Sequence, residues 1–130
     1  MNLDNIVAVT GLPGLYKMAG SRPNGLIVED FDSGKKRFAS IRKHQFTPLE
    51  SVSIYTLADT APLTDVFKKM QEHGQAPATN AAGLELQEYF EAILPDYDED
   101  RVLVSDIRKI VKWFSFLNQR SLLIDSDEEE

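Results

Sequence analysis

Hydrophobic residues in the first 57 positions of the chain come in short runs, and each run stops at turn-forming residues. Glycine, proline and the Asn24-Gly25 pair supply the positive φ angles that tight reversals need, and Asn24-Gly25 is the strongest hairpin-turn signal. Between the last two runs, Pro48 is placed to begin a single helical turn. The runs predict five short strands, at residues 6–9, 15–19, 26–30, 37–41 and 52–56.

Five short strands with one helical turn before the fifth predict a small β-barrel of the SH3-like type, closed or half closed. Closure would protect the strand edges that an open five-stranded sheet leaves exposed. An OB-like barrel is the alternative, but it usually has longer strands and a helix between the third and fourth. This chain has only the stretch DSGKK at that point, which favours the SH3-like form.

The second half of the chain changes to the period of an amphipathic helix, with apolar residues recurring at i, i+3, i+4 and i+7. Pro62 is expected in the first turn of one helix and Gly74 as its left-handed cap. The last helix is expected to start with Ser105 as its N-cap and Asp106 in its first turn. The periodicity predicts three helices, over residues 61–74, 81–94 and 106–119.

These elements place the chain in the α+β class, with a five-stranded SH3-like barrel packed with a C-terminal three-helix region. We predict a barrel over residues 1–58, a helical region over residues 59–122 and a disordered acidic tail over residues 123–130. Each half has about 60 residues, a size at which a single core gives only marginal stability. The helices are therefore expected to pack on the barrel as one cooperative unit.

Composition and charge narrow the class of protein. With 130 residues, of which 42% are hydrophobic, the chain can bury a substantial core. The net charge of −7 is uneven, because residues 1–56 carry +2, residues 57–124 carry −4 and residues 125–130, DSDEEE, carry −5. Such an acidic run is typical of a solubilising end. The chain shows no secretory leader pattern and no run near the ~20 apolar residues of a membrane span, so a cytoplasmic location without membrane contact is expected.

The residue inventory excludes several classes of chemistry. The chain has no cysteine, which removes disulfides, thiolate metal sites and cysteine nucleophiles. His44 and His73 lie far apart in the sequence, and neither has acidic residues at metal-ligand spacing. The motifs G-x-S-x-G, Walker A, G-x-G-x-x-G and H-E-x-x-H do not occur. We therefore predict no catalytic residue, no metal site and no cofactor.

The stretch DYDEDRVLVSDI, residues 96–107, begins like a calcium-binding loop, with acids at its positions 1, 3 and 5. Arg101 stands at position 6, where the sharp turn needs glycine, and Ile107 stands at position 12, where a bidentate acid is needed. The stretch is therefore interpreted as a connection between two helices. Within it, Arg101 is expected to pair with one of the acids Asp96, Asp98, Asp100 or Asp106.

One surface feature favours binding. The stretch KKRFASIRKHQF places basic side chains around Phe38 and Phe46. Basic residues interleaved with aromatics are typical of nucleic-acid surfaces, yet a net charge of +2 is low for a domain of that kind, so a protein partner is favoured over RNA or DNA. The predicted partner-binding residues are Lys35, Lys36, Arg37, Arg42, Lys43 and His44.

Trp113 lies beside the apolar stripe of the last predicted helix. Large amphipathic side chains at such an edge usually close a contact between elements, so Trp113 is expected at the interface of helices and barrel. The alternative is a hot spot for a partner.

Five segments of the chain follow one another at compatible spacing: GLPGLYK, NGLIVED, GKKRF, PLESVSIYT and EYFEAILPDYDEDRVLVSDIRKIVKWF. In these segments the chain resembles an uncharacterised bacterial family, a domain of unknown function. The resemblance covers nearly the whole chain up to about Leu117 and does not include the acidic tail. It implies a cytoplasmic protein with a barrel-like N-terminal half and a helical C-terminal half. It implies no assigned activity, so no catalytic residue is carried over.

Two functions from different classes are compatible with these features. A non-catalytic binding module would hold an unknown macromolecular partner through the basic face of the barrel. A small enzyme would need a pocket between barrel and helices, lined by polar groups. A deep cleft with convergent ionisable groups would favour the enzyme, whereas a flat basic or apolar patch would favour the module. Because no catalytic motif is present, the binding module is the preferred hypothesis.

Overall fold

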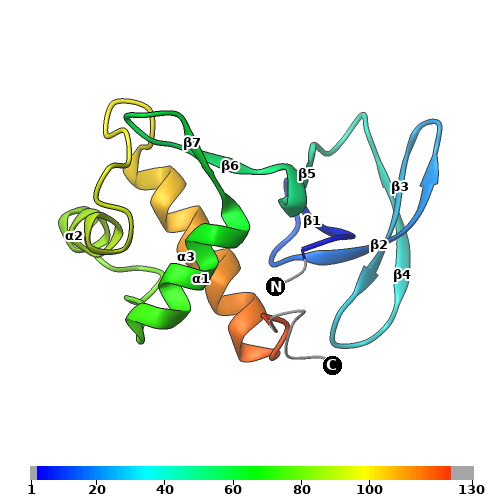
Figure 1. Cartoon of the computed structure of the whole chain (residues 1–130). Coiled ribbons are helices and arrows are strands. Elements are labelled where there is room, and N and C mark those ends of the chain that lie inside the picture. Colours follow the sequence, from blue (N-terminus) through cyan, green and yellow to red (C-terminus); the bar gives the residue numbers. More distant parts are fainter. Residues whose placement is uncertain (1–2, 124–130) are drawn as a thin grey trace, which may run out of the picture. The chain divides into compact units, whose positions relative to one another are not determined.

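The computed structural model of the chain describes residues 3–123, which form two compact units (Figure 1). The first, called here the sheet unit, is Leu3–Val52, and the second, the helical unit, begins at Ser53. The sheet unit therefore ends earlier than the predicted limit at residue 58. The mixed α+β class predicted from the periodicities is confirmed, with strands in the first unit and three helices in the second. The predicted acidic tail lies outside the described residues, except for Leu123, which is buried.

Five antiparallel strands build the sheet unit, in the spatial order β4-β3-β2-β1-β5. The β4 and β5 strands are the two edges of this sheet, so it does not close into a barrel and the predicted SH3-like closure is not confirmed. The strand bounds are β1 (Ile6–Val9), β2 (Tyr16–Arg22), β3 (Gly25–Asp30), β4 (Lys36–Ser40) and β5 (Phe46–Pro48).

The predicted fifth barrel strand belongs to another sheet. It forms β6 (Ser53–Tyr55), which pairs with β7 (Thr60–Pro62) in the helical unit. The fifth strand of the first sheet is instead β5, a three-residue strand that pairs with β1 and that the hydrophobic pattern does not show. The helical turn predicted at Pro48 is present as the short 3-10 helix η1 (Leu49–Ser51), between β5 and β6. A strand as short as β5 offers too few residues for alternation to be recognised.

The β2–β3 hairpin lies where Asn24-Gly25 predicts it, but the turn is built differently. Its two loop residues are Pro23 and Asn24, and Gly25 already pairs with Arg22. Proline holds φ near −65°, which suits the first central position of a turn without positive φ angles. Neither Asn24 nor Gly25 has a positive φ. Gly25 is instead needed for space, because the ring of Phe38 and the carbonyl of Ala39 occupy the position that a Cβ would take.

A single apolar cluster fills one face of the sheet. Alternation places every second side chain of a strand on the same face, so that Leu26, its partner Ala39 and Val28 lie on the core face. The cluster consists of Val7, Val9, Tyr16, Val28 and Ala39, with Leu12, Met18, Leu26 and Phe46 packed against it.

The helices are α1 (Leu63–His73), α2 (Gly83–Ile93) and α3 (Val104–Gln119). The apolar stripes that predict them are buried, and α1 meets α3 through Phe67 and Phe114, whose ring centroids lie 5.8 Å apart. Pro62 precedes the first turn of α1, and Gly74 ends that helix with φ 105° and ψ −126°, outside the left-handed helical region that a predicted cap would occupy. Among residues 3–123, no helix combines the length and the apolarity required to cross a bilayer.

The start of α3 differs from the prediction by two residues. Leu103 is the N-cap, and Ser105 already lies in the first turn. The carboxylate of Asp106 accepts the backbone N–H of Leu103 at 3.0 Å, and this bond supplies the capping that was expected from a serine side chain. Asp106 is therefore the residue that fixes where α3 begins.

Candidate functional site

The predicted basic residues lie together on one edge of the sheet unit. Lys36 and Arg37 belong to the edge strand β4, Lys35 precedes that strand, and Arg42 and Lys43 lie in the turn that follows it. All five side chains are exposed. None of them forms an ion pair with another residue in the described part of the chain, so their charges are available to a partner. These five residues are called here the basic edge.

His44 has a structural role beside the basic edge. Its half-buried ring donates a hydrogen bond from Nδ1 to the carbonyl of Thr10 at 2.7 Å, and the next residue, Gln45, donates its N–H to the Thr10 hydroxyl at 2.7 Å. These two bonds tie the segment before β5 to the end of β1. His44 therefore positions the turn that carries Arg42 and Lys43, and its ring nitrogen Nδ1 is already engaged.

The two aromatic residues of this segment point to different environments. Phe38 is 45% exposed in the middle of β4, and Ile41 in the following turn is 57% exposed. Phe46 instead packs against the sheet core. Only one of the two predicted aromatics, Phe38, is therefore placed on the surface, where its strand also carries the exposed cations Lys36 and Arg37.

The acidic connection at residues 96–101 is a structural junction. Asp98 Oδ2 lies 3.7 Å from Arg101 Nε, as the predicted pairing requires, and Asp98 Oδ1 accepts the N–H of Asp100. The Arg101 guanidinium also lies over the ring of Tyr55, 5.0 Å from its centroid. Backbone bonds from Leu57 to Asp96 and from Asp98 to Tyr55 attach the connection to β6. Within residues 3–123, no three acidic or histidine side chains are grouped so as to hold a metal ion.

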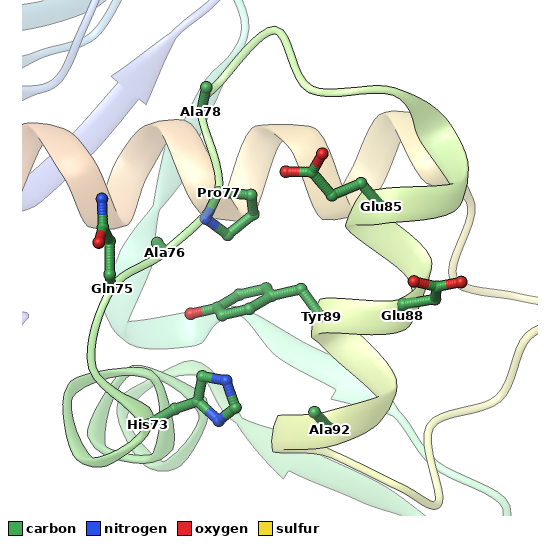
Figure 2. Close-up of a pocket in the computed structure, with 9 residues that line it drawn as sticks. All are labelled: His73, Gln75, Ala76, Pro77, Ala78, Glu85, Glu88, Tyr89 and Ala92. Atoms are coloured by element: carbon green, nitrogen blue, oxygen red, sulfur yellow. The ribbon is translucent and has the colours of Figure 1, made fainter.

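A pocket of about 580 Å³ lies on the helical unit, between α2 and the segment that follows α1 (Figure 2). Figure 2 shows the carboxylate of Glu88 directed away from His73, so the ionisable groups around the pocket do not converge on one point. The sequence does not predict this pocket. The pattern around Tyr89 indicates an amphipathic helix and carries no sign of a cavity beside it. Its lining residues are His73, Gln75, Ala76, Pro77, Ala78, Glu85, Glu88, Tyr89 and Ala92.

Tyr89 is the unusual group of this pocket. The residue is only 9% exposed, and its hydroxyl is buried without a hydrogen-bond partner among the described residues. Its ring meets that of His73 edge to face, with centroids 5.4 Å apart. Burial raises the pKa of Tyr89 to about 12, because the phenolate would lose its hydration.

Replacing Tyr89 with phenylalanine is expected to stabilise the protein by about 1 kcal/mol, since it removes a buried hydroxyl that makes no hydrogen bond. Urea unfolding followed by circular dichroism measures the change. Tyr55→Phe is the matched control, because Tyr55 is exposed and should change stability by less than about 0.5 kcal/mol. A clear loss of stability in Tyr89→Phe would show that the hydroxyl has a partner, such as a bound water.

The same variant changes the pH dependence of stability. The folded protein holds the Tyr89 proton more tightly than the unfolded chain, because its pKa is raised from 10.0 to about 12. The stability that comes from this tighter proton binding is fully present below pH 10 and is lost as the pH rises through 12. The wild-type protein should therefore lose stability more steeply than Tyr89→Phe across this window, and parallel profiles would contradict the assignment.

Trp113 lies on α3 and is partly buried. Its neighbours Val111 and Phe114 belong to the buried stripe of that helix, so Trp113 is at the edge of the stripe as the sequence predicts. Its role at an interface stays a prediction.

Comparison with known proteins gives matches in both units. Residues 52–117 match the model of a domain of unknown function, DUF6852, and residues 3–49 match that of a second one, DUF5606. The chain is also similar to a Bacteroides vulgatus protein whose solution structure was determined by NMR in a structural-genomics programme. The identity is 35%, the match covers 93% of this chain and 89% of that chain, and the TM-score is 0.75. No curated protein matches the chain.

Proposed function

The chain belongs to the family of the domain of unknown function DUF6852, and from that premise we propose that it is a non-catalytic module that binds a protein partner through the basic edge. The observation that carries the proposal is an edge strand with exposed cations that form no ion pairs within residues 3–123, arranged around the exposed Phe38. Unpaired cations around an apolar centre favour an acidic surface and speed its association. We also propose that the protein is cytoplasmic and that its five-stranded sheet is related to half-closed SH3-like barrels.

The two alternatives have weaker support. Nucleic acid would use the same cations, but base stacking usually employs several aromatic side chains, and Phe46 is turned into the core. An enzyme would need convergent ionisable groups, and those around the pocket of the helical unit point apart (Figure 2). A protein partner is therefore the better match to the geometry.

Charge reversal on the basic edge tests the proposal. The double variant Lys36→Glu, Arg42→Glu should retain about tenfold less partner than the wild type in affinity capture from a lysate of the source cells, because two attractive contacts become repulsive. Lys109→Glu with Lys112→Glu is the matched control, since it makes the same charge change at exposed positions of α3.

The capture is carried out with and without nuclease. Retention that survives nuclease and falls only in the basic-edge variant supports a protein partner. Retention that disappears with nuclease assigns the surface to nucleic acid instead. Equal retention by the basic-edge variant and its control would refute the proposed site.

A further inference from the structure

The backbone of β4 has a side that is not used by the sheet. Asp30 donates its N–H to the carbonyl of Lys35 at 2.9 Å, and Ile41 donates its N–H to the carbonyl of Asn24 at 3.0 Å. These bonds lie at the two ends of an uninterrupted antiparallel register. Along a strand of an antiparallel pair, the backbone N–H and C=O groups of alternate residues bond to the partner strand, and those of the residues between them point away from it. Counting from Lys35 and Ile41, Arg37 and Ala39 bond to β3. Lys36, Phe38 and Ser40 therefore direct their N–H and C=O groups away from β3.

These outward groups form a short open ladder. Within the described chain, the N–H and C=O of Lys36 and of Phe38 have no partner. The carbonyl of Ser40 is different, because it accepts the N–H groups of Lys43 and His44 at 3.2 and 3.0 Å. The turn after β4 thus ends the ladder at Ser40, and it holds Arg42 and Lys43 just beyond this point.

Side chains along the open ladder specify what could lie beside it. Lys36 and Phe38 are on one face of β4 and Arg37 is on the other, and all three are exposed. A strand added at this edge would place its side chains next to theirs, because neighbours across a ladder share a face. Acidic residues would suit the positions beside Lys36 and Arg37, and an apolar residue would suit the position beside Phe38.

We infer that β4 is a strand-addition site for an extended, acidic segment of a partner protein, with an apolar residue beside Phe38 and acids beside Lys36 and Arg37. Charge complementarity identifies this occupant. A second copy of the edge would bring like charges together, which is how lysines on edge strands prevent self-association. An acidic strand removes that repulsion and satisfies the open backbone groups.

This inference rests on the proposed function, since it names the partner class and the binding mode of the same basic edge. Charge reversal tests the surface but does not distinguish side-chain contacts from backbone pairing. The distinguishing experiment must change one backbone N–H while leaving the charges intact.

Phe38→Pro makes that change. Proline removes the outward N–H of Phe38 and is tolerated on an edge strand whose N–H faces solvent, so the β3–β4 ladder is kept. Phe38→Ala is the matched control, because it also loses the ring but keeps the N–H. Thermal unfolding of both variants verifies that the sheet unit remains folded.

The probe is the end-capped peptide Glu-Glu-Ile-Thr-Val-Glu-Glu, which is acidic at both ends and β-branched in the middle, so that either strand direction can be accepted. Binding is followed by NMR titration of the whole chain. Shifts should concentrate on the amides of Lys36, Phe38 and Ser40, and Phe38→Pro should bind about tenfold more weakly than Phe38→Ala. N-methylation of one alternate set of peptide amides should weaken binding about tenfold, while methylation of the other set should have less than about a twofold effect.

The possible outcomes distinguish strand addition from other ways of binding at the basic edge. Equal binding by Phe38→Pro and Phe38→Ala, or equal weakening by both methylation patterns, would overturn strand addition while leaving the basic edge as a binding surface. Shifts at β4 with single-stranded oligonucleotide but not with the peptide would overturn the acidic protein segment. If neither probe shifts β4 amides, the inference fails, and the capture result with Lys36→Glu, Arg42→Glu still decides separately whether the basic edge binds a partner.

Discussion

Replacing Gly25 with alanine is expected to destabilise the sheet unit by about 3 kcal/mol, because the new Cβ has no space. The Cβ would overlap the carbonyl oxygen of Ala39 and would lie 2.8 Å from a carbon of the Phe38 ring. A ring can rotate, but the Ala39 carbonyl is part of the β4 backbone. The β3 and β4 strands would therefore have to separate. Urea unfolding measures the loss, and amide exchange of β3 and β4 localises it.

Gly20→Ala is the matched control for this prediction. A Cβ at residue 20 meets the side chain of Ile27 at 3.6 Å and the end of the Arg22 side chain at 3.9 Å, both at ordinary contact distance, and the φ angle of Gly20 is not positive. The change in stability should stay within about 0.5 kcal/mol. If Gly25→Ala is as stable as Gly20→Ala, then the hairpin can move to accept the methyl group and the close approach is not a constraint. Because Phe38 would be displaced, Gly25→Ala should also weaken any binding at the basic edge.

Replacing Phe90 with alanine is expected to destabilise the helical unit by about 4 kcal/mol, since it opens a cavity in a fully buried site. Phe90 also supports Tyr97, whose ring it meets edge to face with centroids 5.0 Å apart. Tyr97 pairs with Thr56 at the side of β6, so its loss of support should loosen the junction that carries Arg101. Urea unfolding followed by Trp113 fluorescence measures the effect within the same unit.

Leu84→Ala is the control on the same helix. Leu84 is 67% exposed, so its truncation should cost less than about 0.5 kcal/mol. A cost below about 1 kcal/mol for Phe90→Ala would contradict the role of this ring, because truncation of a fully buried aromatic normally costs several times more.

Local patterns predicted the helices well and the sheet only in part. The 3.6-residue period identified all three helices, because burial of one face requires that spacing whatever the partner. The strand β1 was predicted with its observed bounds, Ile6–Val9. The pairing of strands was less predictable, because hydrogen bonds in a sheet join residues that are distant in sequence. Nothing local distinguishes β6, which joins β7, from a fifth strand of the first sheet.

The predicted cations could be placed together from the sequence because they are neighbours along the chain. The basic edge is almost contiguous in sequence, so an edge strand and its turn suffice to expose all five cations along one edge of the sheet. The roles of His44 and Phe46 depend on contacts with Thr10 and with the sheet core, and these contacts could not be read from their own segment. The resemblance to an uncharacterised bacterial family is confirmed and supplies no activity.

The sequence by itself determined the α+β class, the three helices, the pairing of Arg101 with an acid of the acidic connection and the place of the cations along the chain; the structure identified that acid as Asp98. Each of these follows from residues close together along the chain. Only the tertiary structure decided that the sheet stays open and that β4 is one of its edges. It also showed that Gly25 is required for space rather than for a positive φ. These features depend on which strands lie side by side. The neighbouring strand decides whether a backbone N–H or C=O group has a hydrogen-bond partner and whether there is space for a Cβ atom, and that neighbour is distant in sequence.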